Sequence, residues 1–196
     1  MVLAAVPTVV GLLIAVPIGW IARAHPALRV TFVSVSGLLY TIPSLALFVA
    51  LPTLIGTRIL DPLNVVVALT IYTVALLVRT VVDGLDSVPA DVRAAATAMG
   101  YRPVRRLLQV ELPVAVPVVG AGVRVAAVTN VSIVSVAALI GVPQLGQLLT
   151  QGFQLASWPP IITGIVGCVV VAVVFDIVVM VVVHYLTGWQ RAGAHR

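Results

Sequence analysis

Residues 83–113, DGLDSVPADVRAAATAMGYRPVRRLLQVELP, decide how the rest of the chain is organised. Ser87 is placed to cap a first helix with Pro89 in its first turn, and Gly100 is a natural stop for that helix. Pro103 opens a second short helix, which we expect to end at the last proline of the stretch. Arginines occupy the polar sides of both helices. The stretch is therefore too amphipathic to cross a bilayer, and is suited to bind a partner at the membrane surface.

The composition is that of an integral membrane protein. Of the 196 residues, 61% are hydrophobic and only 9% are charged, whereas a soluble domain is about half apolar and a quarter charged. The mean hydropathy is +1.21. The formal charge of +5 comes from arginine alone, because the chain has no lysine, and this also excludes a P-loop of the GxxxxGK[ST] type. The single cysteine, Cys168, excludes an internal disulfide.

Five apolar runs are each about long enough to span a bilayer as a helix. We therefore predict an all-α, five-span protein that forms a single transmembrane domain, with residues 83–113 as the loop between its third and fourth spans. The predicted spans are residues 2–22, 30–49, 63–82, 114–140 and 161–186.

The arginines orient these spans. Five spans put the termini on opposite sides, and basic residues favour the cytoplasmic side. One side carries Arg23, Arg29, Arg79, Arg93, Arg102, Arg105, Arg106, Arg191 and Arg196, and only Arg58 falls in a link on the other side. We expect the N-terminus outside, and the loop and the C-terminus in the cytoplasm. Tryptophans at span ends fit this arrangement, namely Trp20, Trp158 and Trp189. This placement of charge argues against a nucleic-acid partner.

The loop resembles a motif of the permease subunits of bacterial ABC importers, E-A-A-x3-G-x9-I-x-L-P. The fixed positions of the motif are occupied by Ala94, Ala95, Ala96, Gly100, Val110, Leu112 and Pro113. The chain departs from the motif at Ala94, where the family has a glutamate. The resemblance implies that this loop docks as a coupling helix on an ATPase subunit, without the polar contact of that glutamate.

Further stretches resemble the osmoprotectant branch of these permeases: TIPSLALFVALP (41–52), ELPVAVPVVGAGVRVA (111–126) and ALIGVPQLG (138–146). The resemblance implies a methionine-permease-like, type I importer core. It also implies that the chain moves a small osmoprotectant such as glycine betaine, choline, carnitine or proline betaine across the bacterial cytoplasmic membrane.

The same resemblance implies partners. These are two ATP-binding subunits, an extracytoplasmic substrate-binding protein, and a second permease subunit, identical or homologous, because one chain has too few spans to enclose a path. ATP and Mg²⁺ would bind the ATPase subunits, so this chain is expected to be a transport subunit with no cofactor of its own and no enzymatic activity. The alternatives are an amino-acid or methionine importer permease, an ion-coupled secondary transporter, and a membrane anchor for an enzyme.

Arg124 and Asp176 lie inside apolar runs, where a charge needs a partner or water. Each is about 15 Å along a helix from its predicted cytoplasmic end, so we expect the two to pair. Such a pair can fix helix packing, or place one charge at the inner end of the transport path.

Other polar groups within the spans are candidates for a path lining: Tyr40, Thr41, Ser44, Tyr72, Asn130 and Ser132. The tyrosine rings would suit a quaternary ammonium group. The alternative is that these groups bond across helices and serve packing alone. The three histidines, His25, His184 and His195, are scattered near span ends, so the sequence predicts no metal site.

Overall fold

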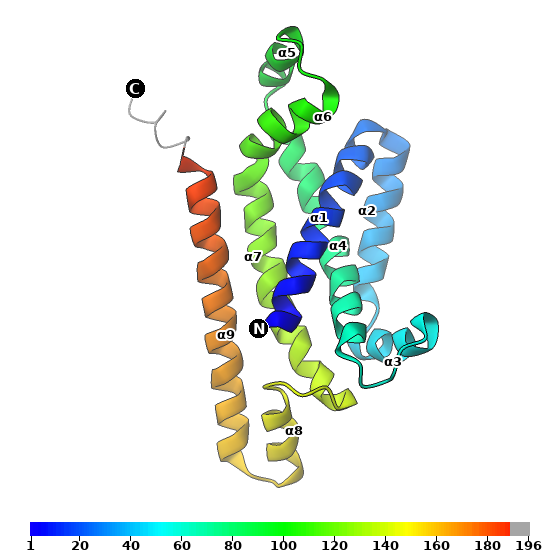
Figure 1. The fold of residues 1–196 in the computed structure, drawn as a ribbon, viewed down its shortest axis with the longest axis vertical. Coiled ribbons are helices and arrows are strands. Elements are labelled where there is room, and N and C mark those ends of the chain that lie inside the picture. Colours follow the sequence, from blue (N-terminus) through cyan, green and yellow to red (C-terminus); the bar gives the residue numbers. More distant parts are fainter. Residues whose placement is uncertain (189–196) are drawn as a thin grey trace.

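The computed structural model describes residues 1–188, and every regular element in that range is a helix. Long helices run side by side, with short helices at both ends (Figure 1). The long helices are α1 (Val2–Ala24), α2 (Pro26–Thr41), α4 (Pro62–Asp86), α7 (Leu112–Val136) and α9 (Trp158–Leu186). One end carries α5 (Ala90–Ala98) and α6 (Pro103–Arg106), and the other carries α3 (Ser44–Ile55) and α8 (Gln147–Gln154). Trp189, Arg191, His195 and Arg196 lie outside the described residues.

The expectation of an all-α membrane protein is confirmed. Within residues 1–188, α1, α4, α9 and the helix through Pro103–Ile140 are long and apolar enough to cross a membrane, and α2 with α3 makes a fifth if that bent pair is one span. Residues 30–49, predicted as the second span, do not form one straight helix, because α2 and α3 meet at an angle of 101°.

Pro43 explains this break. The residue before a proline is pushed out of the helical region, and Ile42 is extended, with ψ 129°. The Ile42 carbonyl accepts a hydrogen bond of 2.5 Å from the Tyr72 hydroxyl on α4. A carbonyl that a proline frees at membrane depth must be satisfied by a neighbour, so Tyr72 stabilises the break.

The loop boundaries also differ from those predicted. Ser87 ends α4 rather than capping α5, since its N–H bonds to the Asp83 carbonyl and its hydroxyl donates to the Gly84 carbonyl. Pro113 does not end the second loop helix. It lies in the first turn of α7, where its missing N–H is tolerated, and α6 continues through a π-helical turn (Leu107–Glu111) into α7. A 3₁₀ turn (Ala137–Ile140) closes that helix at its other end.

The most extensive helix contact joins α1 and α4. Gly11, Ala15 and Gly19 repeat every four residues on the face of α1 that meets α4, and all three are buried. A methyl group added at Gly19 would lie 2.6 Å from the Val81 Cγ1 atom. Small residues at this spacing let membrane helices approach closely, so the contact depends on the absence of side chains.

Replacing Gly19 with valine should therefore separate α1 from α4. Overpacking of this kind costs about 1–3 kcal/mol, and we expect less folded protein in the membrane and a lower thermal midpoint in detergent. Gly37→Val in α2 is the matched control, because it changes helix propensity equally but has open space around the new methyl group. Equal effects of the two variants would contradict the packing role of Gly19.

Candidate functional site

The loop between α4 and α7 projects beyond the long helices and presents α5 at its tip (Figure 1). Gly100 ends this helix with φ +81°, a left-handed conformation that suits glycine. The Tyr101 N–H bonds back to the Ala96 carbonyl, which closes the turn. Ala96 is buried beneath α5, whereas Ala94 and Ala95 are exposed. Apart from Asp91, the exposed residues of α5 are small, so a groove in a partner can approach closely; they are Ala90, Ala94, Ala95, Thr97 and Ala98.

The other predicted loop residues lie behind α5. Leu112 and Pro113 are half-buried at the start of α7, and Leu112 packs at the edge of the hydrophobic core formed by α1, α4 and α7. They fix where the loop joins the bundle rather than forming its exposed surface.

A buried carboxylate ties this loop to the first helix. Glu111, in the π-helical turn, is 1% exposed. It accepts hydrogen bonds from Arg23 of α1 at 2.5 Å and from Arg106 at 2.7 Å. Arg106 also donates to the hydroxyl of Thr97 on α5, at 2.8 Å. The position of α5 is therefore linked to α1 by a chain of charged and polar contacts.

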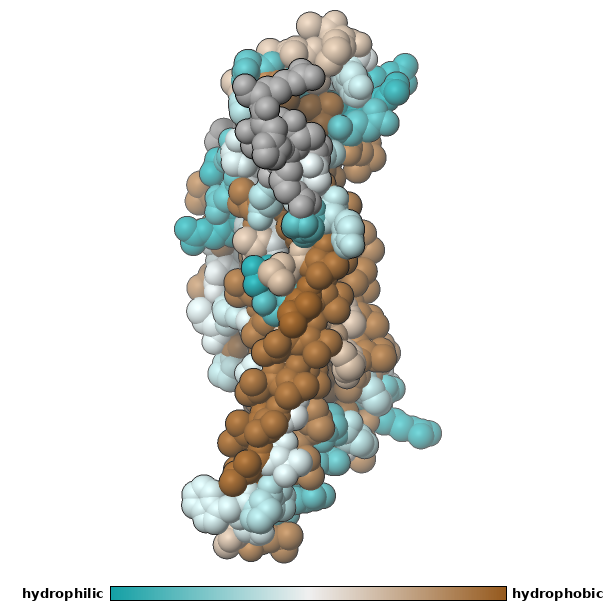
Figure 2. All heavy atoms as spheres, turned by 90° about the vertical axis from the view of Figure 1, so that its left-hand side faces the viewer, coloured by the Kyte–Doolittle hydropathy of each residue, from teal (hydrophilic) through white to brown (hydrophobic). Residues whose placement is uncertain are grey.

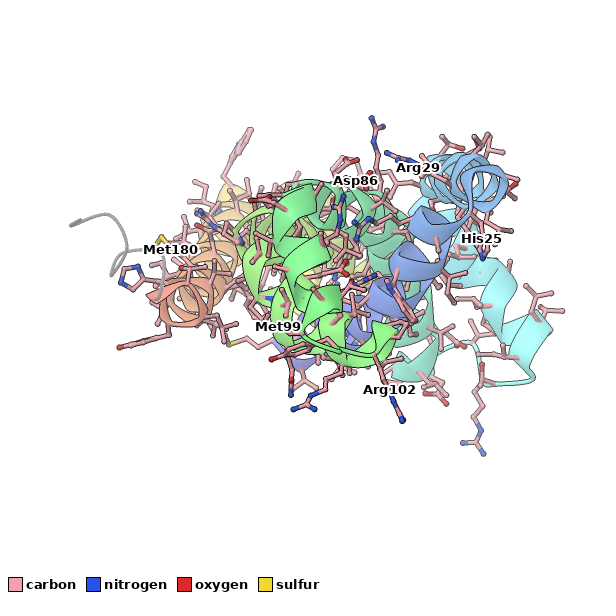
Figure 3. All side chains as sticks on the ribbon, turned by 90° about the horizontal axis from the view of Figure 1, so that it is seen from above. His25, Arg29, Asp86, Met99, Arg102 and Met180 are labelled. Atoms are coloured by element: carbon pink, nitrogen blue, oxygen red, sulfur yellow. The ribbon has the colours of Figure 1, made fainter. Side chains whose placement is uncertain are left out.

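The chain of contacts continues to α2. Arg23 donates to Asp86 of α4 at 3.0 Å, and Arg29 of α2 lies 2.9 Å from the other oxygen of Asp86. Seen from the α5 end, Arg29 and Asp86 lie together at one edge of the bundle, with Met99 and Arg102 of the loop toward the opposite edge (Figure 3). Loop, α1, α2 and α4 thus share one ion-pair cluster, which comprises Arg23, Arg29, Asp86, Arg106 and Glu111.

Sequence reasoning missed this cluster. Glu111 lies within the stretch that resembles the osmoprotectant branch, but its partner Arg23 is 88 residues away. The one available signal was Glu111 itself, the only glutamate in the sequence, beside the arginines of the loop. Beside the cluster is a hollow of about 380 Å³, lined by Trp20, Arg23, Ala24, Arg93, Ala94, Thr97, Arg106 and Glu111. Ala94, where the family motif has glutamate, therefore borders a basic hollow.

Two of the predicted path residues lie inside the protomer. Asn130 of α7 is 2% exposed, and its amide donates to the hydroxyls of Thr8 on α1 and Thr73 on α4, each at 2.9 Å. Tyr72 is also buried and donates to Ile42. Their geometry favours the alternative that these groups bond across helices, because each has its hydrogen bonds within one chain.

The remaining candidates are closer to the surface. Tyr40, Thr41 and Ser44 surround the break between α2 and α3, and Tyr40 is exposed, with its ring edge-to-face on Tyr72 at 5.9 Å between centroids. Ser132 is exposed on α7. Tyr40, Thr41 and Ser44 are thus grouped at the α2–α3 break.

Arg124 and Asp176 meet across α7 and α9. The Arg124 Nε lies 2.7 Å from Oδ1 and its Nη2 lies 2.6 Å from Oδ2, a two-point contact between guanidinium and carboxylate. The pair is only partly covered by the chain itself. In the part of the chain that the structure describes, no three histidine, cysteine, aspartate or glutamate side chains are grouped to hold a metal ion.

Residues 8–191 match the family described as "Binding-protein-dependent transport system inner membrane component". The chain belongs to this family. Its loop between α4 and α7 is therefore part of a transport permease, a subunit that is not itself an enzyme, and its apolar helices are those of an inner-membrane component.

Curated relatives of this permease carry transport names. It is 36% identical to the osmoprotectant import permease protein OsmW of Salmonella typhimurium, over 84% of this chain and 78% of the relative. It is 29% identical to the choline transport system permease protein OpuBB of Bacillus subtilis, over 95% of this chain and 85% of the relative.

A solved structure shares the fold. The chain is similar to a chain of the MetNI methionine ABC transporter in an inward-facing conformation, with a TM-score of 0.83 and 21% identity, over 94% of this chain and 91% of that one. This similarity shows that the permease has the fold expected from its loop motif.

Glu111→Gln should destabilise the permease. Removing one partner from a buried ion pair costs about 3–5 kcal/mol, and here two arginines would lose their shared carboxylate. We expect a clear loss of folded subunit in the membrane and of thermal stability after purification. Asp83→Asn is the control, because its pair with Arg79 is exposed and 4.0 Å long, and surface pairs contribute about 0–1 kcal/mol. Unchanged stability of Glu111→Gln would show that the cluster does not hold the loop.

Proposed function

We propose that this permease carries a small osmoprotectant, a betaine or related quaternary amine, across the cytoplasmic membrane into the cell. The supporting observation is its similarity, over more than four fifths of its length, to permeases named for osmoprotectant and choline transport. Glycine betaine, choline, carnitine and proline betaine share a small cationic ammonium group, and the exposed Tyr40 ring at the α2–α3 break suits such a group.

The energy comes from ATP bound by two separate subunits, which dock on the exposed side of α5. Alanines there leave room for a groove, and the residues behind it connect α5 rigidly to the bundle. When the ATPase subunits close, they move α5, and the ion-pair cluster carries this movement to α1, α2 and α4. A substrate-binding protein docks at the other end, beside α3 and α8. Because both partners bias one conformational equilibrium, their effects on each other are reciprocal.

The orientation follows from the arginines. Arg23, Arg29, Arg93, Arg102, Arg105 and Arg106 belong to the α5 end of the described chain, whereas Arg58 lies in the link after α3. Basic residues favour the cytoplasmic side. The α5 end therefore faces the cytoplasm, which is the side on which the ATPase subunits dock, and the N-terminus faces outward.

Substrate and orientation are tested together by uptake into proteoliposomes that contain the permease, its ATPase subunits and its binding protein. We expect uptake of labelled glycine betaine, choline, carnitine or proline betaine, and none of methionine, when ATP is supplied on the α5 side. Uptake of methionine alone would support the amino-acid alternative. Uptake driven by an ion gradient without ATP would support a secondary transporter.

Gly100→Val should uncouple ATP hydrolysis from uptake. A β-branched residue is strained at φ +81°, so the turn that presents α5 would shift. We expect several-fold less substrate transported per ATP hydrolysed, with the permease still inserted. Gly56→Val is the matched control, because Gly56 has φ +72° and equally open surroundings but lies after α3, at the opposite end. Equal losses of coupling in both variants would contradict the role of α5.

A further inference from the structure

The hollow between the end of α1 and α5 has an excess of positive charge. Its volume is about 380 Å³. Three guanidinium groups line it against one carboxylate, which leaves two positive charges unbalanced; the four residues are Arg23, Arg93, Arg106 and Glu111. Counting Arg29 and Asp86 of the ion-pair cluster as well leaves this excess unchanged. Seen from the α5 end, side-chain nitrogens lie between the loop and α1 (Figure 3).

The arginines of this hollow have hydrogen-bonding capacity left. A guanidinium has five N–H donors. Within residues 1–188, Arg23 and Arg106 each use two of their nitrogens in the ion-pair cluster and on Thr97. Arg93 donates its Nη1 to the backbone carbonyl of Val88, at 2.6 Å, and none of the ion pairs in the same range includes it. Arg93 is therefore best placed to bind an acid from outside the chain.

Ala94 keeps the hollow open. It is exposed on α5 and belongs to the lining, whereas Asp91, the acid of the same helix, does not line the hollow. A glutamate at position 94, as in the family motif, would place a carboxylate beside these arginines and could pair with them within the chain. Alanine has no such group, so the guanidinium donors remain available to a partner.

The hollow opens where a soluble partner can reach it. The loop that carries α5 projects beyond the long helices (Figure 1). The hydrophobic surface of α9 ends below this loop, and hydrophilic patches appear there instead (Figure 2). Three of the lining residues belong to α5 itself, namely Arg93, Ala94 and Thr97. A group that enters the hollow therefore comes from whatever contacts α5.

We propose that the hollow beside Ala94 receives an acidic side chain, aspartate or glutamate, of the ATPase subunit. This assignment rests on the proposed function, in which that subunit docks on α5. It reverses the polar contact that the family motif implies, because here the permease supplies the guanidinium donors and the ATPase supplies the carboxylate. Arg93 binds the carboxylate, and Arg23 and Arg106 add to the positive field around it.

Such a contact would select the partner. Hydrogen bonds between guanidinium and carboxylate are strong and directional, whereas like charges brought together at an interface are strongly unfavourable. A glutamate in the motif needs a donor on the ATPase, since a carboxylate only accepts hydrogen bonds. This permease should therefore favour an ATPase subunit with an acid at that point and discriminate against one with a base there.

Binding of the ATPase subunit to the whole chain in nanodiscs of phosphatidylcholine tests this assignment. Phosphatidylcholine has no net charge, so no anionic lipid competes for the hollow. Ala94→Glu restores the residue of the motif, and Ala94→Gln adds the same bulk without the charge. We expect Ala94→Glu to bind its own ATPase several-fold more weakly than Ala94→Gln, because the new carboxylate occupies the arginines and repels the incoming acid. Equal or tighter binding by Ala94→Glu would overturn the proposal.

Arg93→Gln provides a second measurement. Arg102→Gln is the matched control, because Arg102 is exposed on the same loop but does not line the hollow. We expect Arg93→Gln to bind the ATPase several-fold more weakly than Arg102→Gln. Its affinity should also depend less on salt, because the attraction that salt screens has been removed. Equal affinity and equal salt dependence of the two variants would contradict the proposed contact.

The acid on the ATPase can be identified by replacing the aspartates and glutamates of its docking groove one at a time with asparagine or glutamine. One replacement should weaken binding to the parent permease and leave binding to the Arg93→Gln chain unchanged, because in that chain the pair is already broken. Strictly additive losses for every acid would show that none of them binds Arg93, and the proposal would fail.

Ala95→Trp separates this proposal from the docking on which it rests. Ala95 is exposed on α5 but does not line the hollow. Unchanged ATPase binding by Ala95→Trp would contradict docking on α5 altogether. Lost binding by Ala95→Trp, together with equal binding by the two Ala94 variants, would overturn the acid contact and leave the docking intact. A difference between the Ala94 variants only in nanodiscs that contain phosphatidylglycerol would assign the hollow to a lipid headgroup and also overturn the proposal.

Discussion

The absence of water in the bilayer core is the constraint on which this structure depends. Every polar group at membrane depth must find its partner in protein, and the chain meets this requirement by long-range pairing. Asn130 bonds to both Thr8 and Thr73, which joins α7 to α1 and α4. The Tyr72 hydroxyl satisfies the carbonyl at the break before Pro43. Hydrogen bonds between membrane helices contribute modestly, at about 0.6 kcal/mol on average in one well-studied case, but they fix which faces meet.

At the α5 end, the buried polar groups are paired through charged side chains. Here Glu111 is fully buried and holds two arginines, and its connections reach α1, α2, α4 and the loop. A buried carboxylate with two guanidinium partners has a strong preference for one geometry, because each bond is directional and charged. The loop is therefore attached more firmly than an ordinary surface connection. The π-helical turn that carries Glu111 is the kind of local irregularity often found at functional sites.

The third stabilising feature is the close packing of α1 on α4. Without a hydrophobic driving force between helices in lipid, their contact relies on shape, and the glycines of α1 provide it. The helices that this contact positions, α4 and α7, are those that bear the loop. The loop and the polar cross-links are consequently attached to the same set of packed helices.

The sequence by itself determined the class of the protein and the identity of its loop. Hydropathy sufficed for α1, α4, α7 and α9, because about 20 apolar residues have few alternatives to a helix in a membrane. Gly100 was recognised as a helix stop, since its left-handed conformation is a local property of the backbone. The arginine distribution gave an orientation, which remains a prediction.

Only the tertiary structure decided what depends on contacts between distant residues. The bend at Pro43 was missed because prolines are tolerated in membrane helices, and the sequence does not show whether a neighbour such as Tyr72 will stabilise a break. Ser87 and Pro113 were assigned to the wrong helix ends, because each residue suits either side of a boundary. The pairing of Glu111 with Arg23 could not be predicted, because the two residues are 88 apart in the sequence. Arg124 and Asp176 were expected to meet, but their exposure on an open face follows from how α7 and α9 pack, and no linear pattern records that.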